Sequence, residues 1–201
     1  MFAVGAGSGG ASVDFLRQAT VTPSPLMQPF AAARWPTYLK VISFLGSAVL
    51  LGVGLAAARA IPHGTHVPYA EAVGTLVAFV PPAVGILAAL FVVTGYEIGL
   101  GHLRIRRLLW TTQLSLSGLH RIYADPACMK CSIRIFGNAG LFSFTGIYRN
   151  RTFGRYRAFV TDPNNAVALF LPDRVVVVSP ADVEGFIRFA VARFQGVRVG
   201  P

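Results

Sequence analysis

Two cysteines, Cys128 and Cys131, are separated by two residues in a pattern that serves redox or metal chemistry. In a redox site the first cysteine usually begins a helix, whose dipole lowers the thiol pKa. Here the pair follows Pro126 and precedes residues 132–136, which alternate like a strand. A structural zinc ion needs four ligands, and His120 is the nearest additional candidate. Cysteine-dependent redox or metal binding is therefore an alternative hypothesis, and no cofactor or metal is predicted.

Arginine is the other residue type that could form a functional site. The chain carries 18 Lys and Arg against 8 Asp and Glu, a formal charge of +10, and most of the excess follows Tyr96. Basic residues near a bilayer attract anionic headgroups, at about 1 kcal/mol each. The candidate lipid or anion site comprises Arg104, Arg106, Arg107, Arg149, Arg151 and Arg155. The alternative is that these arginines lie on a solvated strand face and only orient the protein in the membrane, as the positive-inside rule describes. No nucleic-acid recognition motif accompanies the charge, so no nucleic acid is predicted as a partner.

The sequence lacks the motifs of common hydrolases and nucleotide-binding enzymes. G-x-S-x-G, the P-loop and H-E-x-x-H are all absent. Among the few carboxylates, Asp162, Asp173 and Asp182 occupy turn or helix-cap positions that account for them. The protein is therefore predicted to be non-enzymatic.

Two long apolar runs precede this basic region. The first has no charge between Lys40 and Arg59, and the second is likewise uncharged. Crossing a hydrocarbon core of about 30 Å takes about 20 apolar residues in a helix. We predict transmembrane helices at residues 36–61 and 72–96, joined by an external connector at 62–71. The alternative is a pair of buried helices in a soluble domain.

Small residues lie within the first run, at Gly46, Gly52 and Gly54. They permit close approach of a second helix, although biased composition would give the same pattern. A partner protein or a second copy could pack on the hairpin, so a structural subunit of a larger membrane complex is a third hypothesis. Pro81 and Pro82 are expected to kink the second span.

The distribution of basic residues predicts the orientation of the hairpin. Arg17, Arg34 and Lys40 precede the first span, Arg59 alone flanks the connector, and further arginines follow the second span. By the positive-inside rule both termini should be cytoplasmic. Residues 1–33 are expected to be a mostly disordered cytoplasmic tail.

After the second run the pattern changes to alternation of apolar and polar residues, which is typical of half-buried strands. The predicted strands are residues 103–106, 109–115, 119–123, 132–136, 155–161, 166–171 and 174–178. A final amphipathic helix is expected, with Ser179 as its cap, Phe186 and Ala190 on its apolar face, and Gly196 at its end. Strands at this spacing indicate a small barrel or sandwich at residues 97–196, followed by a tail at 197–201.

Glycines, aromatic residues and the last strand-to-helix junction carry a resemblance to a known family. The segments concerned are residues 140–142, 146–150, 154–159 and 175–182, followed by Phe186 and Ile187. Over residues 96–194 the chain resembles the small bacterial PH-like domain family, whose members commonly carry two membrane-spanning helices before the domain.

The resemblance implies an α+β membrane protein: a transmembrane hairpin followed by a seven-stranded pleckstrin-homology-type barrel or sandwich, capped by the C-terminal helix. It supplies no catalytic residues, and the family's ligands are largely unassigned. The expected function is that of a binding module at the inner face of the bacterial plasma membrane, recognising anionic lipid headgroups or a protein partner. A fold does not settle a function.

Overall fold

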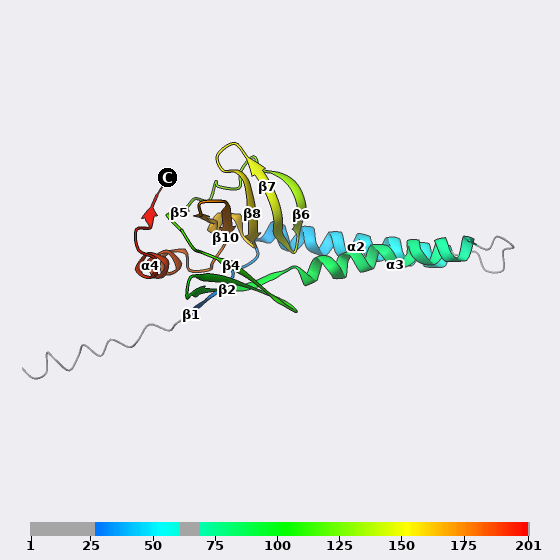
Figure 1. The fold of residues 1–201 in the computed structure, drawn as a ribbon. Coiled ribbons are helices and arrows are strands. Elements are labelled where there is room, and N and C mark those ends of the chain that lie inside the picture. The colour runs from blue at the N-terminus through cyan, green and yellow to red at the C-terminus, as the bar shows by residue number, and fades with distance from the viewer. Residues whose placement is uncertain (1–26, 61–68, 201) are drawn as a thin grey trace, which may run out of the picture.

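The structure, a computed structural model, describes residues 27–60 and 69–200. Two long helices project as a hairpin from a body of two β-sheets and one short helix (Figure 1). The helices are α2 (Thr37–Arg59), α3 (Ala70–Leu90) and α4 (Val183–Arg193). The strands are β1 (Met27–Ala31), β2 (Val93–Gly99), β3 (His102–Arg107), β4 (Thr111–Ser115), β5 (Arg121–Ala124), β6 (Ile133–Leu141), β7 (Ser143–Asn150), β8 (Gly154–Val160), β9 (Val167–Phe170), β10 (Val175–Val178) and β11 (Arg198–Val199).

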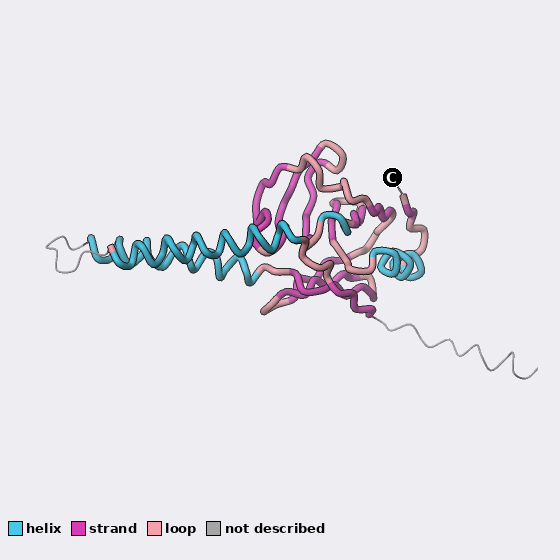
Figure 2. The backbone as a smooth tube through the Cα atoms, turned by 180° about the vertical axis from the view of Figure 1, so that it is seen from behind, coloured by secondary structure: helices cyan, strands magenta, loops and turns pink. Residues whose placement is uncertain are grey.

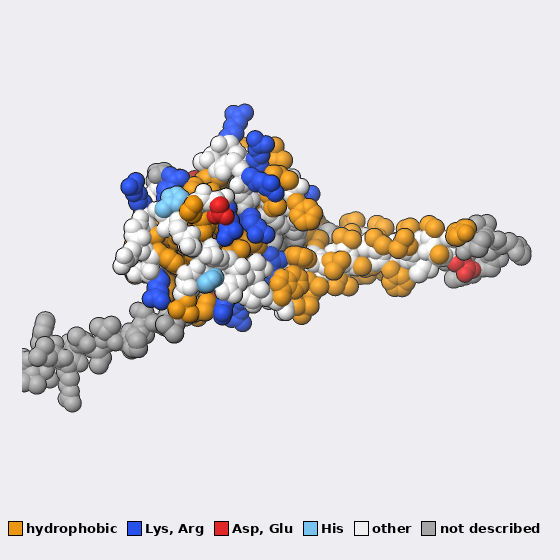
Figure 3. Space-filling model, in the orientation of Figure 1, with side chains coloured by type: hydrophobic (Ala, Val, Ile, Leu, Met, Phe, Trp, Pro, Cys, Tyr) orange, Lys and Arg blue, Asp and Glu red, His pale blue; other side chains and the backbone are white. Residues whose placement is uncertain are grey.

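Helices α2 and α3 are long and apolar enough to cross a membrane, judged by length and composition. Only 11% and 6% of their apolar stretches are buried, whereas the core helix of a soluble domain is mostly buried. Their outward surface is almost entirely apolar (Figure 3). The two helices approach each other closely at Gly54, where an added Cβ would lie 2.6 Å from the carbonyl oxygen of Ala78. The predicted close approach of a second helix is thus confirmed at this glycine.

The second helix ends earlier than predicted. It runs uninterrupted through Pro81 and Pro82 but stops at Leu90, and Val93–Gly99 then form strand β2. Tyr96, predicted to end a transmembrane helix, is fully buried in the body. The prediction of a span through residue 96 is therefore wrong. An uncharged run cannot by itself distinguish the end of an apolar helix from a buried strand.

Part of the N-terminal segment belongs to the folded body. Met27–Ala31 form β1, which precedes the helical hairpin in the sequence. It pairs antiparallel with β2, which follows the hairpin. The prediction of a tail through residue 33 is wrong for this part, whereas residues 1–26 lie outside the described chain. Of the predicted connector, residues 62–68 also lie outside it, and Ala70 already begins α3.

The strands form two open sheets rather than a closed barrel. One sheet has the order β1-β2-β3-β4 and the other β11-β5-β9-β10-β8-β7-β6. Within the described residues the ladders leave both sheets with free edges, and an isolated bridge between Ala32 and Pro180 is the only pairing outside the named strands. Of the predicted seven-stranded barrel or sandwich, closure into a barrel is therefore wrong: the sheets are open, and strands from both ends of the chain enlarge them to four and seven strands.

Most strands in the C-terminal half lie at or near the predicted residues, but β7 was not predicted. It contains Gly146, whose φ of +147° and close approach to the carbonyl oxygen of Phe136 leave no room for a Cβ. Glycine normally weakens a strand signal, although here it allows two backbones to meet. The short β11, in the predicted tail, pairs with β5.

The main core lies between the two sheets and α4. Its fully buried members include Tyr96, Ile105, Leu169 and Phe186. A second cluster, with Tyr148, Tyr156 and Cys128, covers the opposite face of the seven-stranded sheet. Helix α4 lies at the end of the body away from the hairpin (Figures 1 and 2). It therefore covers core residues without touching the two long helices.

The cap of α4 differs from the expected one. Asp182, rather than Ser179, caps it, since its Oδ1 accepts the backbone N–H of Gly185 at 2.8 Å. Ser179 is instead fully buried, and its Oγ accepts the N–H of Thr161 at 2.8 Å. The Thr161 hydroxyl in turn donates to the carbonyl oxygen of Ala33 at 2.8 Å. This buried network fastens the segment before α2 to the large sheet.

Candidate functional site

The structure separates the three arginines of β3. Arg104 and Arg106 point to the outer face of the small sheet. There the Nη1 atoms of Arg104 and Arg106 lie 4.0 and 3.7 Å from the carboxylate oxygens of Glu97. Arg107 follows the parity of the core residues Leu103 and Ile105 and turns inward. Arg104, Arg106 and Arg107 therefore do not form one site.

Arg107 lies in an aromatic enclosure at the border between the sheets. Its guanidinium carbon is 5.1, 5.7 and 5.5 Å from the ring centroids of Phe91, Trp110 and Phe159. Burial, and then the positive charge of Arg157, lower the pKa of Arg107. Its Nε and one terminal nitrogen are buried without a partner among the described residues. The Arg107 guanidinium is thus a partly dehydrated cation that lies near a second cation, Arg157.

The other predicted arginines meet on the face of the large sheet that looks toward the small one. Arg149 of β7 lies directly opposite Arg155 of β8, and Ile147 lies opposite Arg157. Side chains two residues apart on a strand share a face, so Arg155 and Arg157 project together. Like charges directly opposite each other destabilise a sheet, so the arrangement favours a bound anion. Arg151, in the turn after β7, is exposed beyond this row.

A cavity of about 410 Å³ lies along these side chains. Its lining includes Arg155, Arg157 and Arg174, with Asp173 as the acidic member; we call these three arginines with Arg149 the basic groove. Arg174 is partly engaged already, because it lies 3.6 Å from Asp173 and donates to the Ser115 carbonyl oxygen at 3.3 Å. Three arginines against one aspartate leave the cavity strongly positive.

The groove is linked to the base of the hairpin through Arg107, which lies beside Arg157 and contacts Phe91, the residue after α3. Strands β6, β7 and β8 run across the direction of the two long helices (Figure 1). Basic and apolar side chains are interspersed on that side of the body (Figure 3). If the helices cross a bilayer, these strands run along its surface.

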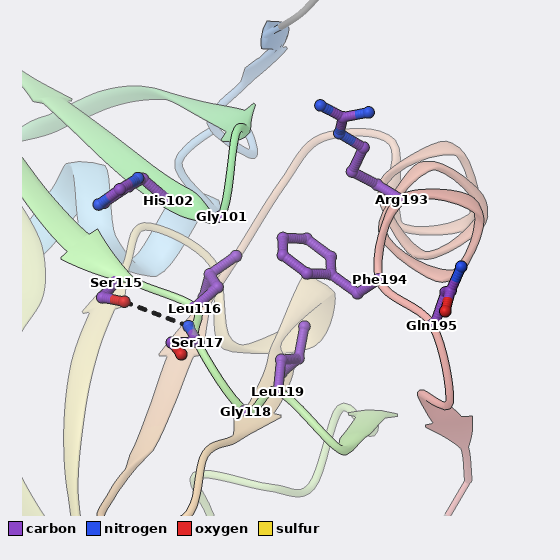
Figure 4. A pocket seen from close by; sticks show the side chains of 10 residues that line it. All are labelled: Gly101, His102, Ser115, Leu116, Ser117, Gly118, Leu119, Arg193, Phe194 and Gln195. Carbon is purple, nitrogen blue, oxygen red and sulfur yellow. Dashed lines mark hydrogen bonds between the residues drawn. The ribbon is translucent and has the colours of Figure 1, made fainter.

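A second cavity, of about 440 Å³, lies at the distal end of the body (Figure 4). Phe194, at the end of α4, and Leu116 and Leu119, in the loop after β4, project into it from opposite sides. Its charged member is Arg193, in the last turn of α4, where a cation is stabilised by the helix dipole. The Nδ1 atom of His102 forms a hydrogen bond of 2.9 Å with the nearby carbonyl oxygen of Leu100. Local structural roles account for these groups.

The cysteine pair is poorly suited to redox chemistry. Cys128 is buried and Cys131 is exposed, and both are free thiols. Burial, with a smaller contribution from Asp125, raises the pKa of Cys128 to about 12. Such a thiol stays protonated at neutral pH, and the thiolate is the reactive form. In the described chain no cluster of three or more His, Cys, Asp or Glu could hold a metal ion.

Two members of the groove escaped sequence reasoning. Arg157 could have been found, because its alternation with Arg155 places both on one face of β8. Arg174 follows a tight turn, and its place beside them results from the parallel pairing of β10 with β8. That pairing has no local signal.

Comparison of the chain with known protein families identifies the family to which it belongs. A family model described as bacterial PH domain matches residues 94–194, half of the chain. Comparison with curated proteins and with solved structures gives no match. The matched region begins in β2 and ends just after α4, so it covers most of both sheets. The chain therefore belongs to the bacterial PH domain family.

Proposed function

We propose that this protein is a non-enzymatic binding module, anchored by α2 and α3, that holds anionic lipid headgroups in the basic groove at the inner face of a bacterial membrane. PH domains are generally binding modules rather than catalysts. The carrying observation is the cross-strand pair of Arg149 and Arg155, continued by Arg157 and Arg174 around one cavity.

The chemistry of the groove suits a phosphate group. A guanidinium presents a planar fork of N–H donors that matches two phosphate oxygens. Arg155 and Arg157 are exposed and lie on one face, so both can engage one headgroup. A bound anion would also relieve the repulsion between Arg149 and Arg155.

The anchored position strengthens this interaction. Basic residues held near a leaflet contribute about 1 kcal/mol each to binding of anionic lipid. Arg107, beside Arg157, extends the positive region toward the end of α3 through its contact with Phe91. The positive charge therefore continues from the groove to the base of the hairpin.

Lipid retention by the full-length protein tests the proposal. The protein in mixed micelles of phosphatidylglycerol and phosphatidylcholine is analysed by native mass spectrometry, as wild type and as Arg155→Gln/Arg157→Gln. Two lost contacts of about 1 kcal/mol each predict an approximately 30-fold weaker apparent affinity for phosphatidylglycerol, with smaller effects at high salt.

The matched control is Arg104→Gln/Arg106→Gln, which removes the same charge from the outer face beside Glu97. It should leave lipid retention near wild type. An equal loss in both double variants would show a general charge effect and contradict a site in the groove.

A protein partner is the second candidate, favoured by the edge strand β6. This strand ends the large sheet, and the side chains of Ile133, Ile135 and Phe136 are 74%, 52% and 75% exposed. An exposed edge can accept a strand from another chain. A photocrosslinking residue at position 136, activated in native membranes, separates the candidates. A protein adduct of defined mass supports a partner, and adducts with lipid alone contradict one at this edge.

A further inference from the structure

The turn between β6 and β7 lies beside the hairpin, well past the base of α2. The backbone N–H of Phe142 donates to the hydroxyl of Ser43 at 2.8 Å. Next to it, an added Cβ at Gly46 would lie 3.0 Å from Leu141 Cδ1. Phe142 also shares a small apolar cavity with Gly85 and Ala89 of α3. The turn therefore contacts both long helices.

Charged residues at the two ends of α2 set the depth scale. Lys40 and Arg59 are 19 positions apart, or about 28 Å along a helix, which matches a hydrocarbon core of about 30 Å. With these two charges at the headgroup levels, Ser43 lies about 4 to 5 Å and Gly46 about 9 Å inside the near interface.

Helix α3 gives the same depth independently. It ends at Leu90, and Phe91 is next to the ring of Trp110, at 5.1 Å between centroids. Tryptophan is a residue type that favours the headgroup level. Counting back from Phe91, Ala89 and Gly85 lie about 3 and 9 Å deeper. We infer that the β6–β7 turn, with Leu141 and Phe142 at its tip, dips about 5 to 10 Å into the acyl-chain region of the same leaflet.

The hydrogen bonds of the turn suit an environment without water. An unpaired backbone group in hydrocarbon costs several kcal/mol. The N–H of Leu141 donates to Asn138 Oδ1 at 3.2 Å, and the Asn138 amide donates back to the Leu141 carbonyl oxygen. Ser143 and Thr145, both buried, pair their hydroxyls at 3.0 Å. Ser43 itself, 2% exposed, uses its hydroxyl on the turn.

A second apolar turn accompanies the first, at a shallower level. It joins β3 to β4, and its Leu108 and Leu109 are 60% and 71% exposed. Trp110 in the same turn contacts Phe91 at the end of α3. Tryptophan favours the headgroup level, so this turn rests at the interface while the other passes below it. Together the two turns fix the tilt of the body on the membrane.

This inference rests on the proposed membrane anchoring but not on headgroup binding. Its test uses full-length protein in vesicles of phosphatidylethanolamine and phosphatidylglycerol, with both native cysteines replaced (Cys128→Ser and Cys131→Ser). Single spin labels are placed through Leu141→Cys in the turn, Leu51→Cys midway along α2 and Thr152→Cys in the exposed β7–β8 turn. Electron paramagnetic resonance then measures access of oxygen and of a water-soluble nickel chelate.

The label at 141 should resemble the label at 51, with collision with nickel at least about tenfold lower than at 152, because a polar chelate is excluded from hydrocarbon. A label at 141 as accessible as that at 152, with 51 protected, would overturn the insertion and leave the anchoring intact. Nickel access at both 141 and 51 would overturn both.

A native fluorophore provides a measurement that leaves the turn unchanged. The Trp35 ring is 6.0 Å from that of Phe142. In a Trp110→Phe protein, brominated acyl chains should quench Trp35 if the turn is inserted. Unquenched Trp35 emission, equal in plain and brominated vesicles, would contradict the insertion even if the cysteine variants fail to fold.

Discussion

The backbone N–H of Ser179 donates to the hydroxyl of Tyr96 at 3.1 Å, although 83 positions separate the two residues. The same hydroxyl donates to the carbonyl oxygen of Phe159 at 2.5 Å. Both hydrogen bonds are buried, and they join the small sheet to the large one within the core. Tyr96 is therefore a structural link between the sheets.

Tyr96→Phe should destabilise the protein by about 1 to 3 kcal/mol, because it leaves a buried N–H and a buried carbonyl group without this partner. Thermal unfolding of the detergent-solubilised protein measures the loss. Tyr69→Phe is the control, since Tyr69 is 76% exposed. Equal melting temperatures for the two variants would show that the hydroxyl contributes nothing.

Alkaline pH should reduce this difference. Burial raises the pKa of Tyr96 to about 12, against 10.0 for an ordinary tyrosine. Between pH 10 and 12 the unfolded state releases this proton while the folded state keeps it, so the stability of the wild type falls. The cost of Tyr96→Phe should thus be about 1 kcal/mol smaller at pH 11 than at pH 7. A pH-independent difference would contradict the raised pKa.

Gly54→Ala should loosen the hairpin. The new methyl group would lie 2.6 Å from the Ala78 carbonyl oxygen and 3.0 Å from Pro82, so the helices must separate. Overpacking of this kind costs about 1 to 3 kcal/mol. Gly52→Ala is the matched control, because no atom lies within 4 Å of its added Cβ. Denaturation in mild detergent, followed by the helical circular dichroism signal, compares them; the same midpoint for both would refute the contact.

The two cysteines should differ sharply in reactivity. With a pKa of about 12, only about one part in ten thousand of Cys128 is thiolate at pH 8. Maleimide should therefore modify the folded protein at exposed Cys131, and Cys131→Ser should abolish most labelling while Cys128→Ser changes little. Mass spectrometry of the labelled protein decides. Rapid labelling of Cys128 at neutral pH would revive the cysteine-dependent hypothesis.

Ser43→Ala should release the β6–β7 turn from α2. The Phe142 N–H would lose its acceptor, at a cost of about 1 to 3 kcal/mol. Hydrogen exchange of the peptide containing Phe142 should become faster in the variant. Ser47→Ala, one turn further along α2, is the comparison, and equally fast exchange in both would contradict a specific role for Ser43.

Local patterns explain which parts were predictable. A span between Lys40 and Arg59 follows from the absence of charge, and strands such as β9 and β10 follow from short apolar runs bounded by turns. The end of α3 was misjudged because no charged residue occurs between Glu71 and Glu97, so the uncharged run passes from α3 into β2 without a break. The cap of α4 was misjudged because Ser179 and Asp182 are both good caps. Each error comes from a residue whose role depends on a distant partner.

The candidate site was predictable only in part for the same reason. Arg149 and Arg155 flank one turn, so their proximity is local. Arg107 comes to lie beside Arg157 through the packing of one sheet on the other, and Arg174 joins the groove through the parallel pairing of β10 with β8.

The sequence by itself determined the two apolar helices, the basic β-rich domain after them and its closing helix, because hydrophobic periodicity and uncharged length are local properties. The tertiary structure alone decided that β1 crosses back to pair with β2, that the sheets stay open, and that the turn at Leu141 and Phe142 lies along the hairpin. Strand register and packing between distant segments arise from the mutual burial of surfaces, which no short stretch of sequence encodes.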